Sequence, residues 1–152
     1  MALKTIHVRD LPTLTGTAFA SPRWIEVTQA QVDEFAHATG DHQWIHVDPE
    51  RAARESPFHR TIAHGYLSLA LVPPLLFEML EVTGARLVIN YGTNKVRFPA
   101  PVPVGSRVRL TGEVASVEPV EGGFQVLLKV AMEIEGSSKP AMAAEVIYRY
   151  LA

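Results

Sequence analysis

The sequence of 152 residues contains no cysteine. A disulfide framework, a cysteine-ligated zinc site and a thiol nucleophile are therefore excluded, and the absence fits a reducing compartment. The chain also lacks an excess of charge of one sign, because 14 Lys and Arg residues face 16 Asp and Glu residues, for a net charge of −2. Without a basic cluster, the composition argues against a nucleic-acid partner and against a charge-driven membrane contact.

No long uninterrupted hydrophobic run is present either. The longest apolar stretch, residues 66–77, contains Pro73 and Pro74 and is shorter than the roughly 20 residues that a membrane-spanning helix requires. The first twelve residues, MALKTIHVRDLP, contain no apolar segment of the kind found in secretory signals. We therefore expect a cytoplasmic protein without a membrane segment.

We expect residues 1–152 to form a single domain, which is large enough to bury a core. Residues 1–22 are a weakly patterned lead-in with room for one edge strand, and residues 24–27 resemble a short strand. A helix is predicted between Thr28, which has capping-box spacing to Gln31, and Gly40, a residue typical of helix ends. Asp48-Pro49 predicts the start of a second, short helix.

Residues 65–83 predict the main helix of the chain. Apolar side chains cover nearly its whole circumference, so we expect it to be buried on all sides and kinked by its two prolines. From residue 86 onward the hydrophobic period changes to two, and glycine- or proline-rich turns separate strand-like segments at 87–91, 95–98, 104–117, 124–135 and 141–151. The pattern predicts an α+β domain in which an antiparallel meander of four or five strands curls around one helix.

Residues 39–68 hold most of the chemically active side chains, including four of the six histidines. Asp41 and His46 lie five residues apart on a predicted turn, where a carboxylate beside an imidazole can hold and activate a water molecule. The same two residues also fit a plainer interpretation, in which Asp41 caps the turn and His46 is a hydrogen-bonded surface or core histidine.

Gly65 opens the predicted main helix. The first N–H groups of a helix have no partners within it and lie at the positive end of its dipole, so a carbonyl bound there is polarised. Glycine lets a ligand approach the backbone closely. The alternative is an ordinary helix start with glycine for steric clearance.

Other chemistries find less support in the sequence. His42 and His46 are four residues apart, and three histidines can form a catalytic zinc site, but Gly40 breaks the helix that would align them and no H-E-x-x-H pattern is present. We therefore expect no metal and no cofactor. Ser56 or Ser68 could pair with a histidine, yet no G-x-S-x-G motif exists. The PAPVPVG stretch at 99–105 fits a bend between strands.

Three segments together resemble the MaoC-like dehydratase family, which includes the (R)-specific enoyl-CoA hydratases. The most specific segment is TGDHQWIH at 39–46, followed by Ala52; the others are TIAHG at 61–65 and NYGTNKVRFPAPVPVG at 90–105, which is most similar to the NodN-type branch. The resemblance covers roughly residues 24–150. It implies a hot-dog fold, in which a bent antiparallel sheet wraps a long central helix, and a homodimer with the two sheets joined edge to edge.

The resemblance also implies a reaction, the reversible hydration of (2E)-enoyl-CoA thioesters to (3R)-3-hydroxyacyl-CoA. Asp41 and His46 occupy the positions that activate the water in the family, and Gly65 the position whose N–H binds the thioester oxygen. Two alternatives stay open: a hot-dog acyl-CoA thioesterase, and a non-catalytic module that binds acyl-CoA.

The sequence departs from the family pattern at two points. Gln43-Trp44 replaces an Asn-Pro pair, so Trp44 either narrows the acyl pocket or simply packs. Pro73 stands where some relatives have a serine, and Ser68 is therefore given no role. Gln43, Trp44, the Gly65 neighbour His64, and Arg97 as a partner for CoA phosphates are candidate substrate-binding residues.

Overall fold

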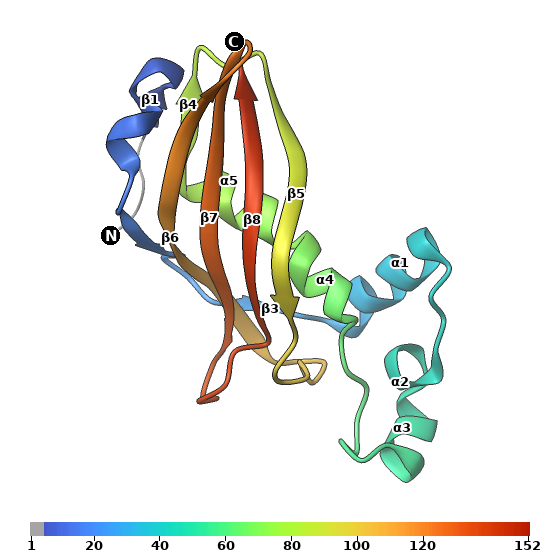
Figure 1. Cartoon of the computed structure of the whole chain (residues 1–152). Coiled ribbons are helices and arrows are strands. Elements are labelled where there is room, and N and C mark those ends of the chain that lie inside the picture. Colours follow the sequence, from blue (N-terminus) through green and yellow to red (C-terminus); the bar gives the residue numbers. More distant parts are fainter. Residues whose placement is uncertain (1–4) are drawn as a thin grey trace.

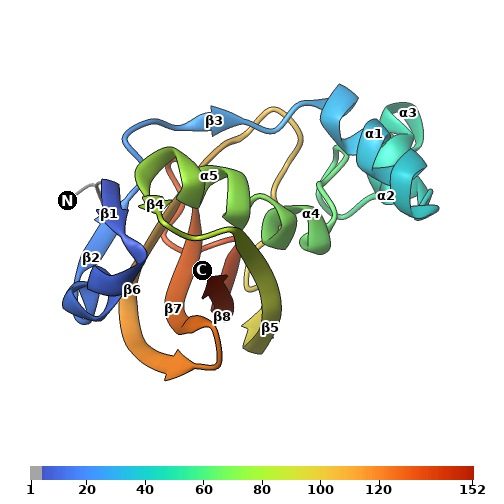
Figure 2. The same cartoon turned by 90° about the horizontal axis from the view of Figure 1, so that it is seen from above.

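A computed structural model describes residues 5–152. Its main sheet is antiparallel and curls around two consecutive helices, α4 (Gly65–Ala70) and α5 (Val72–Met79). Figure 1 shows the sheet standing in front of these helices, and Figure 2 shows from above how the strands curve around one side of them. Leu71 separates the two helices two residues before Pro73, and both prolines lie in the first turn of α5. The predicted kink is therefore present as a break, because proline cannot supply the backbone N–H that a continuous helix needs.

The main sheet differs from the predicted meander in the position of one strand. Strands β6, β7 and β8 follow one another as neighbours, but the preceding strand β5 pairs with β8 rather than with β6. Residues 98–106 therefore cross the sheet, a long-range connection that hydrophobic periodicity cannot reveal. Gly92 does not end a strand but lies in β5 at a bulge. The four strands are β5 (Leu87–Arg97), β6 (Arg107–Val120), β7 (Gly123–Ile134) and β8 (Met142–Leu151).

The lead-in is more ordered than the sequence predicts. Residues 5–22 contain β1 (Thr5–His7), the 3-10 helix η1 (Val8–Leu14) and β2 (Ala18–Ala20). Residues 1–4 of the predicted lead-in lie outside the described residues. Both β2 and β3 (Ile25–Glu26) pair with β6, and β1 pairs in parallel with β4 (Glu81–Thr83). The predicted helix of residues 65–83 was therefore too long, because its last residues, including the β-branched Val82 and Thr83, join a strand.

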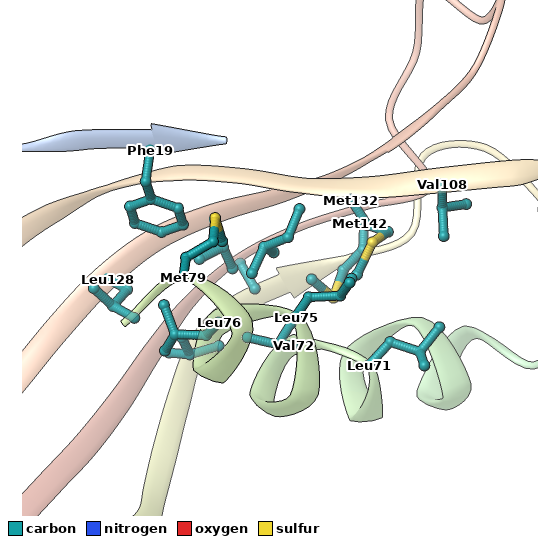
Figure 3. Close-up of a cluster of buried hydrophobic side chains, with 14 of the residues drawn as sticks. Phe19, Leu71, Val72, Leu75, Leu76, Met79, Val108, Leu128, Met132 and Met142 are labelled. Atoms are coloured by element: carbon teal, nitrogen blue, oxygen red, sulfur yellow. The ribbon is translucent and has the colours of Figure 1, made fainter. Parts of the chain in front are cut away.

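The core lies between the sheet and one face of α4 and α5. In Figure 3, Leu75, Leu76 and Met79 of α5 point toward the sheet, and Met132 and Met142 come from β7 and β8. Burying a side chain of this size contributes about 1.5–3 kcal/mol. The opposite helix face is open, because Tyr66 and Phe77 are 70% and 48% exposed. The prediction that the helix is buried on all sides was therefore wrong for the single chain.

Three helices between residues 29 and 55 project beyond the sheet, next to α4 (Figure 1). As predicted, the Thr28 side chain accepts a hydrogen bond from the Gln31 N–H at 3.2 Å, and Gly40 ends the first helix at φ 83°. The Asp48 side chain caps the third helix through the Arg51 N–H at 3.0 Å. A one-turn helix replaces part of the turn predicted at 41–47. The three are α1 (Gln29–Thr39), α2 (Trp44–Val47) and α3 (Pro49–Glu55).

These elements together form the hot-dog arrangement that the family resemblance implies: a curled antiparallel sheet around a central helical segment. Among residues 5–152, no helix has the length and apolar character required to cross a membrane.

Candidate active site

The site is assembled around the short segment 61–65, which leads into α4. The Ile62 N–H donates to the Ile45 carbonyl at 3.0 Å, and this bond ties the segment to α2. On the other side, the Ala63 N–H donates to the Val102 carbonyl at 2.8 Å, and the Val104 N–H donates to the Thr61 carbonyl at 2.9 Å. The segment is thus held between α2 and the crossing connection 98–106. This placement brings residues from 41–46 next to the start of α4.

Asp41, His46 and His64 form one cluster, in which a carboxylate oxygen of Asp41 and one ring nitrogen of each histidine all lie within 4.8 Å of one another. The His46 and His64 rings stack at 3.9 Å between centroids, with 25° between their planes. His64 Nε2 donates to the Asp41 carbonyl oxygen at 3.0 Å and lies 4.0 Å from the carboxylate atom Oδ2. Both histidines are buried, whereas the Asp41 side chain is 52% exposed. The cluster therefore presents a solvated carboxylate beside a buried imidazole pair.

The protonation state of His46 follows from its surroundings. Its Nδ1 lies 2.7 Å from the Ile62 carbonyl, which can only accept, so Nδ1 carries the hydrogen and a neutral ring has its lone pair on Nε2. Burial lowers the pKa of His46 below its ordinary value of 6.5, and the nearby His64 also lowers it, while the Ile62 hydrogen bond and Asp41 partly oppose this shift. At neutral pH His46 is therefore an uncharged hydrogen-bond acceptor.

His64 contacts a second aromatic ring besides His46. Phe35 of α1 lies 4.8 Å away between centroids, with 56° between the two planes. Nδ1 of His64 is buried and has no hydrogen-bond partner among the described residues. Such an unpaired buried polar atom is unfavourable for stability, so the retention of a histidine here indicates a role beyond packing.

The same three side chains are the group whose donor atoms come close enough to consider a metal ion. Ligands of a tetrahedral zinc ion at about 2.1 Å lie roughly 3.4 Å from one another, whereas His64 Nε2 lies 4.0 Å from Asp41 Oδ2 and is engaged by the Asp41 carbonyl. Two face-to-face imidazoles also direct their in-plane lone pairs along nearly parallel lines rather than toward one point. The arrangement suits acid–base chemistry better than metal binding.

A cavity of about 330 Å³ lies beside the cluster. His46 and Gly65 line it, so the buried imidazole and the start of α4 face the same space. No described residue accepts a hydrogen bond from the Gly65 N–H. A Cβ atom at position 65 would lie 3.1 Å from the Phe98 ring, so a larger residue there would require this ring to move. The cavity is lined by His46, Phe58, Ile62, Ala63, Gly65, Ser68, Phe98, Ala100, Pro101, Val102 and Ala141.

A second cavity, of about 260 Å³, lies on the other side of α4. It is bounded by Tyr66, Leu69 and Pro73 on the helices and by residues of β5 and β8. Pro73, the residue at the serine position of some relatives, therefore faces this cavity and not the one that contains His46.

The structure brings Asp41, His46, His64 and Gly65 together, as the sequence suggests. Of all the candidates, His46 and Gly65 line the cavity, whereas Asp41 and His64 lie beside it and the remaining three lie elsewhere. Trp44 packs under the Arg51 guanidinium at 4.4 Å. Gln43 contributes its backbone N–H, which donates to Asp41 Oδ1 at 3.4 Å. Arg97 is exposed at the end of β5, where it donates to the Val96 carbonyl at 2.7 Å.

Sequence reasoning missed several residues of the site. Ser68 was given no role, yet it is buried and lines the cavity one helical turn after Gly65. Phe98 was not singled out, although it packs over Gly65. Gln29 hydrogen-bonds to the His46 carbonyl and to the Thr61 hydroxyl. These contacts join positions 17 and 32 residues apart, so no local sequence pattern indicates them.

The curled sheet, the central helices and the acid–imidazole pair at the helix start define a hot-dog protein of the hydratase type. The model of the family described as "MaoC like domain" matches residues 10–134, and the chain belongs to this family. The resemblance seen in the sequence is thereby confirmed.

Individual relatives agree with this assignment. The chain is 55% identical over 146 residues to 3-hydroxyacyl-thioester dehydratase Z of Mycobacterium tuberculosis, covering 95% of this chain and 96% of the relative. It is 43% identical to nodulation protein N of Rhizobium leguminosarum bv. viciae, covering 91% and 88% of the two chains. Among solved structures, the (R)-hydratase from A. caviae involved in PHA biosynthesis matches with a TM-score of 0.73 and 25% identity, over 90% and 96% of the two chains.

Proposed function

We propose that the protein catalyses the reversible hydration of (2E)-enoyl-CoA thioesters to (3R)-3-hydroxyacyl-CoA. The observation that carries this proposal is the convergence of Asp41 and His46 beside a cavity that the Gly65 backbone also lines. The dehydratase name of a relative that is 55% identical over nearly the whole chain supports the same reaction class.

Asp41 and His46 are the proposed water-activating pair. His46 offers an acceptor at Nε2, because its Nδ1 hydrogen is committed to the Ile62 carbonyl. The Asp41 carboxylate supplies a second acceptor nearby. A water molecule that donates one hydrogen to each keeps its oxygen lone pair for attack on C3 of the enoyl group, with Asp41 as the base. The proton that the attacking water gives up is then delivered to C2, either by way of His46 or directly, so that one water molecule supplies both the hydroxyl group at C3 and the hydrogen at C2.

The Gly65 N–H is the proposed partner of the thioester oxygen. Attack at C3 transfers negative charge to this oxygen, and an N–H at a helix start stabilises such charge. The N–H has no acceptor within the described residues, so it is available to a ligand. Removal of a single donor of this kind from an enzyme lowers the rate by roughly 10²–10³-fold.

Substrate contacts outside the reacting atoms are also part of the proposal. Arg97 immediately precedes Phe98, a residue of the cavity wall, and its exposed guanidinium suits a CoA phosphate. Trp44 lies against Arg51 rather than on the cavity wall, which favours packing over a direct role in chain-length selection. Gln43 and His64 act through Asp41 in this scheme, because both bond to that residue.

The homodimer implied by the family resemblance is part of the proposal as well. Strand β5 is the last strand in the order of the main sheet, and it exposes Leu87, Val88, Ile89 and Tyr91. A long apolar edge strand is a template for pairing with another chain. The exposed Tyr66 and Phe77 of α4 and α5 extend this apolar surface.

The test uses purified protein with crotonyl-CoA and follows the loss of enoyl absorbance. Asp41→Asn and His46→Gln should each lower kcat by roughly 10²–10⁴-fold with a much smaller change in KM. His42→Gln is a matched control, because His42 is exposed in the same loop. Release of free thiol without loss of the enoyl group would instead indicate a thioesterase, and binding of CoA esters without turnover would indicate a non-catalytic module.

A further inference from the structure

Gln29, the first residue of α1, joins the two segments that hold His46. Its Nε2 donates to the His46 backbone carbonyl at 2.7 Å, and its Oε1 accepts from the Thr61 hydroxyl at 2.6 Å. The same Nε2 also lies 2.9 Å from Asp33 Oδ1. Both ends of one amide are therefore engaged, one with α2 and the other with the segment that leads to α4.

This bridge bears directly on the ring of His46. Thr61 is buried and precedes Ile62, whose carbonyl accepts the Nδ1 hydrogen of His46. Gln29 thus holds the backbone of His46 at one end and, through Thr61, the acceptor of its side chain at the other. His46 is therefore held at two points, by Gln29 at its backbone carbonyl and by the Ile62 carbonyl at Nδ1. Together these contacts fix the position of His46 and determine which of its nitrogens carries the hydrogen.

We infer that Gln29 and Thr61 are positioning residues, which keep His46 in the tautomer with the lone pair on Nε2. The inference rests on the proposed function only for its effect on catalysis, since the tautomer of His46 can be observed without substrate. Neither residue lines the cavity, so their substitution should affect the alignment of His46 rather than the binding of substrate.

The first test measures the imidazole nitrogen signals of His46 by ¹⁵N NMR in the free protein. We expect the wild-type protein to show predominantly the tautomer with hydrogen on Nδ1. Gln29→Met removes the hydrogen bonds to His46 and Thr61, and the local one to Asp33, at nearly unchanged shape. It should give a mixture of the two tautomers. Gln31→Met is the matched control, because Gln31 lies in the same helix and its Oε1 has no partner; its spectrum should remain like that of the wild type.

The second test uses Thr61, in case Gln29→Met does not fold. Thr61→Val removes the hydroxyl and should shift the tautomers as Gln29→Met does, whereas Thr61→Ser retains the hydroxyl and should restore the wild-type signals. With crotonyl-CoA, Gln29→Met and Thr61→Val should lower kcat about tenfold and change KM less than twofold, as expected for a small misplacement of a catalytic group.

The inference is overturned if His46 keeps its wild-type tautomer in both Gln29→Met and Thr61→Val. Absence of hydration by the wild-type protein, with the tautomers shifting as expected, would instead reject the proposed function and leave the positioning role intact.

Discussion

Replacement of His64 by phenylalanine separates its structural contribution from its role in the site. The His64 ring contacts both Phe35 and His46, so a phenylalanine ring retains both aromatic contacts. The substitution removes the hydrogen bond from Nε2 to the Asp41 carbonyl, a contribution of about 0.5–1.5 kcal/mol to stability. Because Asp41 is exposed, water can take over that carbonyl.

A second effect acts in the opposite direction. Wild-type His64 buries Nδ1 without a partner, and an unsatisfied buried polar atom costs about 1–3 kcal/mol. Together the two effects place the free energy of unfolding of His64→Phe between about 0.5 kcal/mol below and about 2.5 kcal/mol above that of the wild type. His64→Ala also loses the packed ring and should be destabilised by about 3 kcal/mol or more.

Activity should respond differently from stability. Without the bond from His64, the Asp41 backbone is no longer tied to the start of α4, and kcat for enoyl-CoA hydration should fall about tenfold in His64→Phe. Urea denaturation measures the free energy of unfolding, and the crotonyl-CoA assay measures kcat. If His64→Phe is as unstable as His64→Ala, or if it retains full kcat, the reasoning about His64 is refuted.

Two further predictions concern His46 and the sheet edge. Because burial lowers the pKa of His46 in the folded protein below 6.5, the unfolded chain takes up the proton first. The contribution of His46 to the free energy of unfolding is therefore fully present above pH 6.5 and decreases as the pH falls from 6.5 toward the folded pKa. In urea titrations at several pH values, the free energy of unfolding of His46→Gln should fall less steeply below pH 6.5 than that of the wild type. An equally steep fall in both proteins would contradict the assignment. Ile89→Lys on the β5 edge should convert a dimer into monomers in sedimentation experiments, whereas Ala53→Lys on exposed α3 should not. A wild-type monomer, or a dimer that survives Ile89→Lys, would refute the edge-to-edge pairing.

The local features of the fold could be read from single residues. Thr28, Gly40 and Asp48 define helix ends through contacts with their immediate neighbours, and the structure confirms each of them. The reciprocal half of the capping box, by contrast, is not formed, because Gln31 Oε1 is buried without a partner. The period of two predicted over residues 124–135 is confirmed in β7, where buried side chains alternate with more exposed ones, since a strand directs successive side chains to opposite sides.

Features that depend on distant pairing could not be read in the same way. The pairing of β5 with β8 and the conversion of residues 81–83 into a strand depend on partners far away in the sequence. The same limit applies to the site. The 41–46 motif and Gly65 were visible as local patterns, but the stacking of His64 on His46 and the Gln29–Thr61 bridge exist only after folding.

The central claim is that Asp41, His46 and the Gly65 N–H add water to an enoyl thioester with a defined stereochemistry. Its most direct test is the configuration of the product formed from crotonyl-CoA by the wild-type protein, with Asp41→Asn as the control. The account predicts (3R)-3-hydroxybutyryl-CoA with the thioester intact, and a rate reduced at least about 100-fold in the variant. Formation of the (3S) product, or an undiminished rate in Asp41→Asn, would contradict it.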